Sequence, residues 1–148
     1  MKIFESVKPR SNQLIEELCR VWQASVRATH DFLTDDDILQ IADYVPEALK
    51  NIDILLIAQD GERNLIGFAG IDKQKLEMLF IHPNYFKRGT GKSLFHLAVE
   101  QFGVCEVDVN EQNFAARVFY EHMGFVVFAR DEFDAQGNPF PILHMKSK

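Results

Sequence analysis

The sequence is poor in cysteine and has no arrangement of cysteines typical of a disulfide framework or a metal site. Cys19 and Cys105 are the only two. Neither belongs to a C-x-x-C pair, and no histidine stands near them at metal-ligand spacing. We therefore expect two reduced thiols, a cytoplasmic protein and no bound metal.

The sequence also lacks the segments that would direct a chain into a membrane. Its first five residues begin like a strand and have no signal-peptide apolar run. No uninterrupted apolar stretch approaches the roughly 20 residues that a transmembrane helix needs. Positive charge is not in excess, because 16 Lys and Arg face 22 Asp and Glu for a formal net charge of −6. Neither nucleic acid nor an anionic membrane is therefore expected as a partner.

Repeats, low-complexity tracts and Pro/Gly/Ser-rich linkers are absent as well. A chain of 148 residues with 47% hydrophobic content is long enough to bury a core. We therefore treat residues 1–148 as one globular domain.

What the sequence does contain is a regular alternation of apolar patterns. Helical spacing of apolar residues predicts a helix over 12–28, and Thr34 or Asp35 begins a second helix that ends before Pro46 or near Lys50. Two apolar runs, 54–58 and 65–71, flank a polar turn and predict a β-hairpin. The remaining expected elements are strands at 2–7, 76–81, 105–109, 125–130 and 141–145 and helices at 90–102 and 113–123.

The order of these elements predicts the fold class. A meander of antiparallel strands precedes a strand–helix–strand–helix unit, which brings a parallel pair. We expect an α/β (α+β) domain with a mixed, mostly antiparallel sheet of six to seven strands and about four helices on both faces.

One segment predicts a phosphate site. The strand at 76–81 leads into a turn containing Gly89 and Gly91, which opens a helix. Glycines let the backbone approach a ligand closely, and the first amides of a helix have no intrahelical partner, so they bind phosphate oxygens. A helix start with ordinary surface cations is the alternative. Phe86 excludes a P-loop, because that motif needs glycine at this position.

A second segment, residues 108–125, carries polar side chains suited to binding or catalysis on one strand and on the helix that follows it. Alternation places Asp108 on the face of its strand opposite Val107 and Val109. On the following helix Asn113 and Tyr120 share a face, with a small alanine between them that leaves room for a ligand. The alternative is that Asn113 only caps the helix and that Tyr120 is a core aromatic.

The two segments, in this order, resemble the GNAT superfamily of acetyltransferases. Its acyl-CoA loop is Arg/Gln-x-x-Gly-x-Gly/Ala, and residues 86–91 match both glycines but have Phe86 at the first position. Its later signature, Asn-x-x-Ala/Gly-x-x-x-Tyr-x-x-x-Gly-Phe, is matched by Asn113, Ala116, Tyr120, Gly124 and Phe125. Residues 28–33 and 134–141 are further similar to a group of bacterial GNAT proteins without firmly assigned substrates.

The resemblance implies an N-acetyltransferase that uses acetyl-CoA as co-substrate and needs no metal. It implies that the acceptor amine attacks the thioester directly and that Tyr120 donates a proton to the departing thiolate. It implies that Asn113 hydrogen-bonds the cofactor. The resemblance further implies that the pantetheine arm pairs with backbone groups of Leu79, Phe80 and Ile81. The residues expected at the pyrophosphate are Lys87, Arg88, Gly89, Thr90, Gly91 and Lys92.

The general base is left between two carboxylates. Some family members use an acid five positions before the matched Asn, here Asp108, and others use a Glu on the strand before the CoA loop, here Glu77. We prefer Asp108. His30 and Asp31 fall where the family shapes its acceptor pocket, either to bind the acceptor or to act as base, unless they only cap the next helix. The other histidines, His82, His96, His122 and His144, show no constellation.

The acceptor is not defined by the sequence. Short loops and a Phe-rich composition favour a small-molecule amine slightly over a protein, and a homodimer is expected by family analogy alone. A non-catalytic acyl-CoA-binding sensor or regulatory module is the alternative function. Tyr120 favours the enzyme, because binding alone does not need an acid there.

Overall fold

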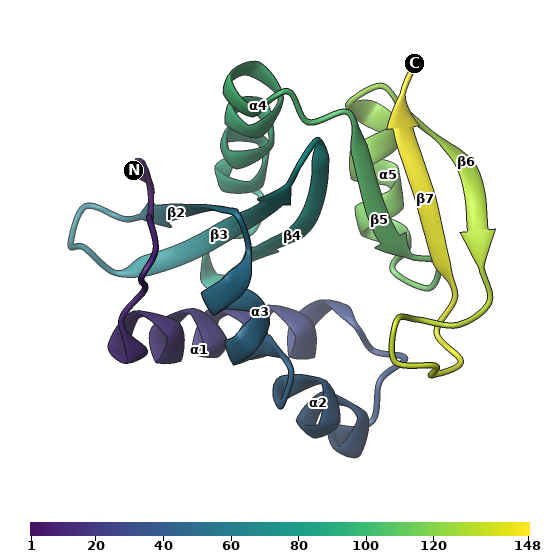
Figure 1. Cartoon of the computed structure of the whole chain (residues 1–148), viewed down its shortest axis with the longest axis horizontal. Coiled ribbons are helices and arrows are strands. Elements are labelled where there is room, and N and C mark those ends of the chain that lie inside the picture. Colours follow the sequence, from purple (N-terminus) through teal and green to yellow (C-terminus); the bar gives the residue numbers. More distant parts are fainter.

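A computed structural model describes residues 1–148 as one seven-stranded mixed sheet with helices on both faces (Figure 1). The strand order is β1-β2-β3-β4-β5-β7-β6, and only β4 and β5 pair in parallel. The fold class predicted from the sequence is thereby confirmed. The strands are β1 (Lys2–Glu5), β2 (Ile54–Gln59), β3 (Leu65–Asp72), β4 (Lys75–Ile81), β5 (Glu106–Asn110), β6 (Phe125–Asp131) and β7 (Ile142–Ser147).

Five α-helices and a short 3₁₀ helix connect the strands. They are α1 (Asn12–Thr29), α2 (Asp35–Ala42), α3 (Val45–Asn51), η1 (Pro83–Tyr85), α4 (Thr90–Phe102) and α5 (Phe114–His122). None of them combines the length and the apolar character that a membrane span requires.

The segment between Thr34 and Asn51 forms two helices where the sequence predicted one. Thr34, one of the two residues that the sequence offered as the cap, begins α2 through a reciprocal capping box with Asp37. Pro46, however, lies in the first turn of α3, where its missing N–H costs nothing because that amide has no helical partner anyway. The proline therefore starts a helix here instead of ending one.

Each face of the sheet has its own hydrophobic core. Helix α1 packs on one face, with α2 and α3 against it, around buried residues such as Trp22 and Phe68. Helices α4 and α5 cover the other face around residues such as Leu94 and Phe95 (Figure 1). Apolar alternation along β2 serves both cores, because Leu55 and Ile57 face one and Leu56 and Ala58 the other.

The sheet opens between β4 and β5. These strands are paired only at Lys75–Glu106 and Leu76–Val107, after which they diverge (Figure 1). The opening coincides with a β-bulge: Ile71 faces Leu76 and Gly70 faces Met78, so Glu77 has no partner on β3. A bulge bends its strand and redirects a side chain, which here turns Glu77 toward the opening.

Candidate active site

A cavity of about 710 Å³ occupies the opening between β4 and β5. Its walls come from the end of α1, β4, the loop into α4, β5 and α5, with one residue from β7. Because both faces of the sheet contribute, the cavity connects the side of α1 with the side of α4 and α5. Two substrates can therefore enter from opposite faces and meet between the strands.

The expected phosphate site lies at the start of α4. Gly89 is the N-cap residue in a left-handed conformation (φ 82°), and no side chain caps the helix. Lys87 also has positive φ (62°). Lys87, Gly89, Thr90, Gly91 and Lys92 line the cavity. The uncapped amides of the first turn and the positive end of the helix dipole suit an anion.

Arg88 lies differently from the other residues of this loop. It does not line the cavity, and its guanidinium lies 5.3 Å from the centre of the Tyr85 ring. The Tyr85 hydroxyl donates to Asp60 Oδ2 at 2.7 Å. Asp60 also accepts from Asn64 and Glu62, and these hydrogen bonds hold the pKa of its carboxyl well below the ordinary range. The loop is thereby anchored to the β2–β3 turn.

The edge of β4 that faces the cavity carries no strand beyond Leu76. Leu79, Phe80 and Ile81 all line the cavity there, while their other edge is paired with β3. Phe86, the departure from the family loop, also lines the cavity. An extended ligand can therefore add to the open edge as a further strand does.

The helix α5 brings Asn113 and Tyr120 to the cavity. Asn113 caps α5, because its Oδ1 accepts from the Ala116 amide at 3.2 Å, and it also lines the cavity. The helix cap is therefore present, and it uses the oxygen of Asn113, so the amide nitrogen keeps its hydrogens for another acceptor.

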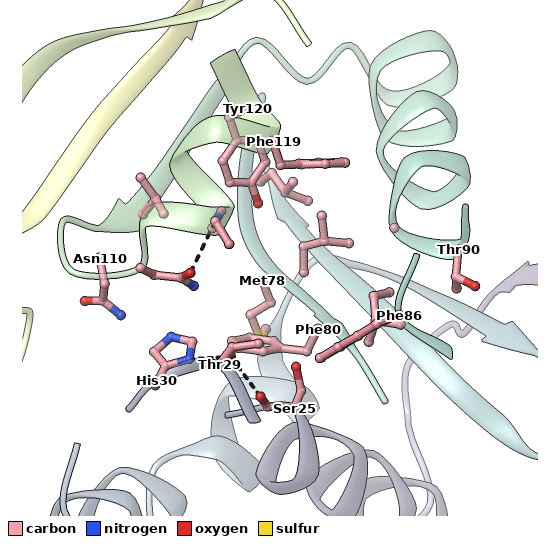
Figure 2. A pocket seen from close by; sticks show the side chains of 18 of the residues that line it. Ser25, Thr29, His30, Met78, Phe80, Phe86, Thr90, Asn110, Phe119 and Tyr120 are labelled. Atoms are coloured by element: carbon pink, nitrogen blue, oxygen red, sulfur yellow. Dashed lines mark hydrogen bonds between the residues drawn. The ribbon is translucent and has the colours of Figure 1, made fainter. Parts of the chain in front are cut away.

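Tyr120 is 7% exposed, and its burial raises the pKa of the phenol well above the ordinary value. Its hydroxyl makes no hydrogen bond to the protein. The only buried side-chain nitrogen or oxygen without a partner is Arg10 Nη2, so the Tyr120 oxygen is not a fully buried atom. The hydroxyl therefore opens to the cavity, into which Figure 2 shows it pointing. A phenol held neutral in this way can donate a proton.

Two carboxylates, Asp108 and Glu77, line the same cavity. Asp108 is engaged at both oxygens: Oδ1 is 2.6 Å from His144 Nδ1, and Oδ2 is 2.6 Å from Lys75 Nζ. Glu77 Oε1 is 3.9 Å from the same Lys75 Nζ. Burial raises the pKa of Glu77, and Lys75 opposes that shift. Glu77 is thus the carboxylate with the freer oxygens.

His144 corrects the expectation that the other histidines belong to no constellation. Its Nε2 lies 2.8 Å from Asp131 Oδ2, so the ring joins Asp108 to Asp131 across β5, β7 and β6. The register explains the contact, because His144 faces Asp108 on β5 and Ala129 on β6. Strand order could not be read from the sequence, and neither could this cluster. No group of His, Cys, Asp and Glu has the arrangement of a metal site.

His30 and Asp31, the expected acceptor residues, separate in the structure. His30 is 8% exposed and lines the cavity, whereas Asp31 is exposed and does not. Burial lowers the pKa of His30 to about 4, against an opposing effect of Asp31. The His30 ring packs on Phe32 (5.3 Å between centres), which packs on Phe140 before β7.

The cavity also contains residues that the sequence analysis did not single out. They include Ser25, Thr29, Met78, Asn110 and Phe119. Ser25 had one usable signal: it is a polar residue on the otherwise apolar stripe of α1, where it is 4% exposed. Asn110 had another, because it shares the strand face of Asp108.

The chain is similar to known proteins in both sequence and fold. A family model described as an acetyltransferase (GNAT) domain matches residues 36–147. The peptidyl-lysine N-acetyltransferase YjaB of Salmonella typhimurium is 35% identical over 134 residues, which cover 88% of this chain and 89% of that protein. The solution structure of apo-form YjaB from Escherichia coli superposes with a TM-score of 0.85 at 34% identity and covers 99% of this chain and 97% of that one.

A more distant structure shares the fold. The PaiA N-acetyltransferase of Thermoplasma acidophilum, solved in complex with coenzyme A, has a TM-score of 0.66 at 24% identity, with 99% of both chains covered.

Proposed function

The chain belongs to the GNAT family of acetyltransferases, and we propose that it transfers the acetyl group of acetyl-CoA to the side-chain amine of a lysine in a peptide or protein. N-acetyl transfer to an amine follows from the family and from its named relatives. The lysine is our proposal. The observation that carries it is a cavity, open through the sheet, that combines an apolar wall with two carboxylates.

The acceptor side of the cavity suits a lysine side chain. Met78 and Phe80 on the α1 face of β4 offer apolar surface for four methylene groups. Glu77 and Asp108 supply negative charge that attracts an ammonium group. The relatives named peptidyl-lysine N-acetyltransferases support this acceptor over the small molecule that the sequence slightly favoured.

The co-substrate side suits acetyl-CoA. We place its pantetheine arm along the open edge of β4 at Leu79–Ile81 and its pyrophosphate at residues 87–92, beside the start of α4. Asn113 has an amide nitrogen free to donate to it. Acetyl-CoA supplies an activated acyl group, so no nucleophile of the protein is required.

The residues at the junction of the two halves handle protons. Tyr120, neutral and without a protein partner, donates to the sulfur as the C–S bond breaks. The acceptor enters as an ammonium with an ordinary pKa of about 10.4, and a carboxylate removes its first proton through water. We assign this step to Glu77, because both oxygens of Asp108 are engaged with Lys75 and His144.

An assay of acceptors tests the proposal. The purified protein is incubated with acetyl-CoA and either a lysine-containing peptide with a blocked N-terminus or free small amines such as spermidine. Thiol release and the mass gain of the product are measured. We expect acetylation of the lysine with a higher kcat/KM than for any small amine, and none when arginine replaces that lysine.

Two other results of this assay would contradict different parts of the proposal. A small amine that outperforms every peptide would overturn the acceptor. Binding of acetyl-CoA with no transfer to any amine would favour the sensor function instead.

A further inference from the structure

A short hydrogen-bonded chain at the end of α1 sets the tautomer of the neutral His30 ring. The Thr29 hydroxyl donates its proton to the Ser25 carbonyl oxygen at 2.8 Å. Thr29 Oγ1 also lies 2.8 Å from His30 Nδ1. A hydroxyl has one proton and two lone pairs. Since the proton is given to Ser25, Nδ1 must donate to Thr29, and the neutral ring therefore carries its lone pair on Nε2.

That lone pair faces the cavity. Nε2 of His30 has no hydrogen-bond partner in the protein, and it is not among the buried atoms that lack one. Because the residue lines the cavity, its free nitrogen opens there. In Figure 2 the His30 ring and the Tyr120 ring extend into the cavity from opposite sides.

The surroundings of His30 keep the ring neutral and fixed. Burial favours the uncharged imidazole and lowers the pKa of His30 to about 4. Phe32 packs against the ring at a centre distance of 5.3 Å. The charge that acts on the ring comes from Asp31, which favours the protonated form but is exposed. His30 thus presents a hydrogen-bond-accepting nitrogen to the cavity that it lines.

We propose that His30 Nε2 binds the attacking nitrogen of the acceptor and takes its proton as the new bond forms, with Thr29 as the positioning residue that sets the tautomer. This inference rests on the proposed function. The amine nitrogen bonds to the thioester carbon and loses one proton to Nε2. The C–S bond breaks, and the departing sulfur takes a proton from Tyr120. Solvent then returns the proton from imidazolium to phenolate.

This role differs from that of Glu77. The carboxylate acts earlier, converting ammonium to amine through water, whereas His30 contacts the amine during attack. A histidine that is neutral before the acceptor arrives does not repel the ammonium, and its lone pair orients the nitrogen toward the thioester. Orientation of this kind is a large source of rate acceleration.

Substitution of His30 tests the contact. His30→Phe keeps the ring packing on Phe32 but has no lone pair, so we expect kcat for lysine acetylation to fall roughly 100-fold. Acetyl-CoA affinity and the unfolding midpoint should stay as in wild type. In His30→Gln an amide oxygen can accept a hydrogen bond without taking the proton, and we expect an intermediate rate. His96→Phe, an exposed histidine on α4, is the matched control.

Substitution of Thr29 tests the tautomer. Thr29→Val keeps the shape of the side chain but removes the hydroxyl, so Nδ1 loses its partner and either tautomer forms. We expect kcat to fall between wild type and His30→Phe. Thr29→Ser restores the hydroxyl and should recover most of the loss. If Thr29 had only a structural role, kcat of the two variants would follow their stability and would not depend on whether the hydroxyl is present.

The outcomes separate this inference from the proposed function. Wild-type transfer to lysine with unchanged kcat in His30→Phe would overturn the role of His30 and leave the function standing. If wild type transfers acetyl groups only to small amines, the His30 variants are assayed on that amine, and the same comparison decides. Equal rates for Thr29→Val and Thr29→Ser would remove Thr29 as the positioning residue.

Discussion

At the scale of single residues, the cavity gathers polar atoms that the fold leaves without partners. The Tyr120 hydroxyl and His30 Nε2 are both open to it, while almost every buried polar side-chain atom elsewhere is bonded. Polar atoms that open to a cavity and have no protein partner are available to water or to a bound ligand.

The two carboxylates should respond differently to loss of charge. Glu77→Gln removes the freer carboxylate, so we expect a lower kcat/KM for the acceptor below about pH 8, where the lysine is almost all ammonium. The loss should shrink at higher pH, where more amine is present without help. Asp108→Asn should instead lower stability, because it breaks contacts to Lys75 and His144. The test is a pH profile of kcat/KM for both variants, together with their unfolding midpoints. A larger pH-dependent loss of kcat/KM in Asp108→Asn would assign the base to Asp108 instead of Glu77.

Gly89 has a conformation that other residues rarely adopt, with φ at 82° and no atom close to where a Cβ would lie. Gly89→Val should therefore cost stability through backbone strain, roughly 1–2 kcal/mol, and weaken acetyl-CoA binding by placing a branched side chain in the phosphate site. Gly61→Val, at an exposed turn without positive φ, is the control. Calorimetry with acetyl-CoA gives both affinities. Unchanged acetyl-CoA affinity in Gly89→Val would mean that acetyl-CoA does not bind at the start of α4.

At the scale of elements, the hydrogen bond from Tyr85 to Asp60 connects the β2–β3 turn to the loop before α4. Tyr85→Phe removes this bond and keeps the ring under Arg88. The loop should become less ordered, and the KM for acetyl-CoA should rise several-fold while the KM for the acceptor stays constant. Tyr44→Phe, on an exposed tyrosine, controls for the loss of a hydroxyl. An equal change in both KM values would contradict this role.

The Asp108–His144–Asp131 cluster joins β5, β7 and β6 and should make stability depend on pH. Burial opposes the charged ring, but hydrogen bonds to Asp131 and Asp108 outweigh it, so the pKa of His144 is raised. The stabilisation is complete below the ordinary pKa of about 6.5 and is lost as pH rises through the higher folded value. The loss of stability in His144→Phe should thus be largest near about pH 6 and small near about pH 9. If the stability difference between wild type and His144→Phe instead grows with pH, a protonated His144 does not stabilise the cluster.

Elements with strong local signals were predictable from the sequence, and those that depend on distant contacts were not. The capping residue Thr34 and the glycine turn at 89–91 act within a few residues, so their patterns were sufficient. Glu77 acquires its direction from a bulge against β3, and His144 acquires its partners from strand order. Pro46 is compatible with either end of a helix; in the structure Val45 and Leu49 beside it are buried in the same core as α1, a distant contact that the local pattern does not contain.

At the scale of the whole molecule, function follows from incomplete closure of one sheet. The β4–β5 pair ends after two residue pairs, and the opening joins the two faces on which the two hydrophobic cores lie. The sequence indicated both segments that border the opening, and the family resemblance pointed to His30, but nothing in the sequence singled out Thr29 beside it.

The most direct test of the account is kcat for acetyl transfer in Tyr120→Phe, measured with acetyl-CoA affinity by calorimetry on the same preparation. Phenylalanine keeps the packing of α5 and removes only the proton that the sulfur needs. The account predicts a fall in kcat of roughly 100-fold with acetyl-CoA affinity near that of wild type. Equal kcat in the two proteins would contradict it, because the phenol that opens into the cavity would then take no part in the reaction.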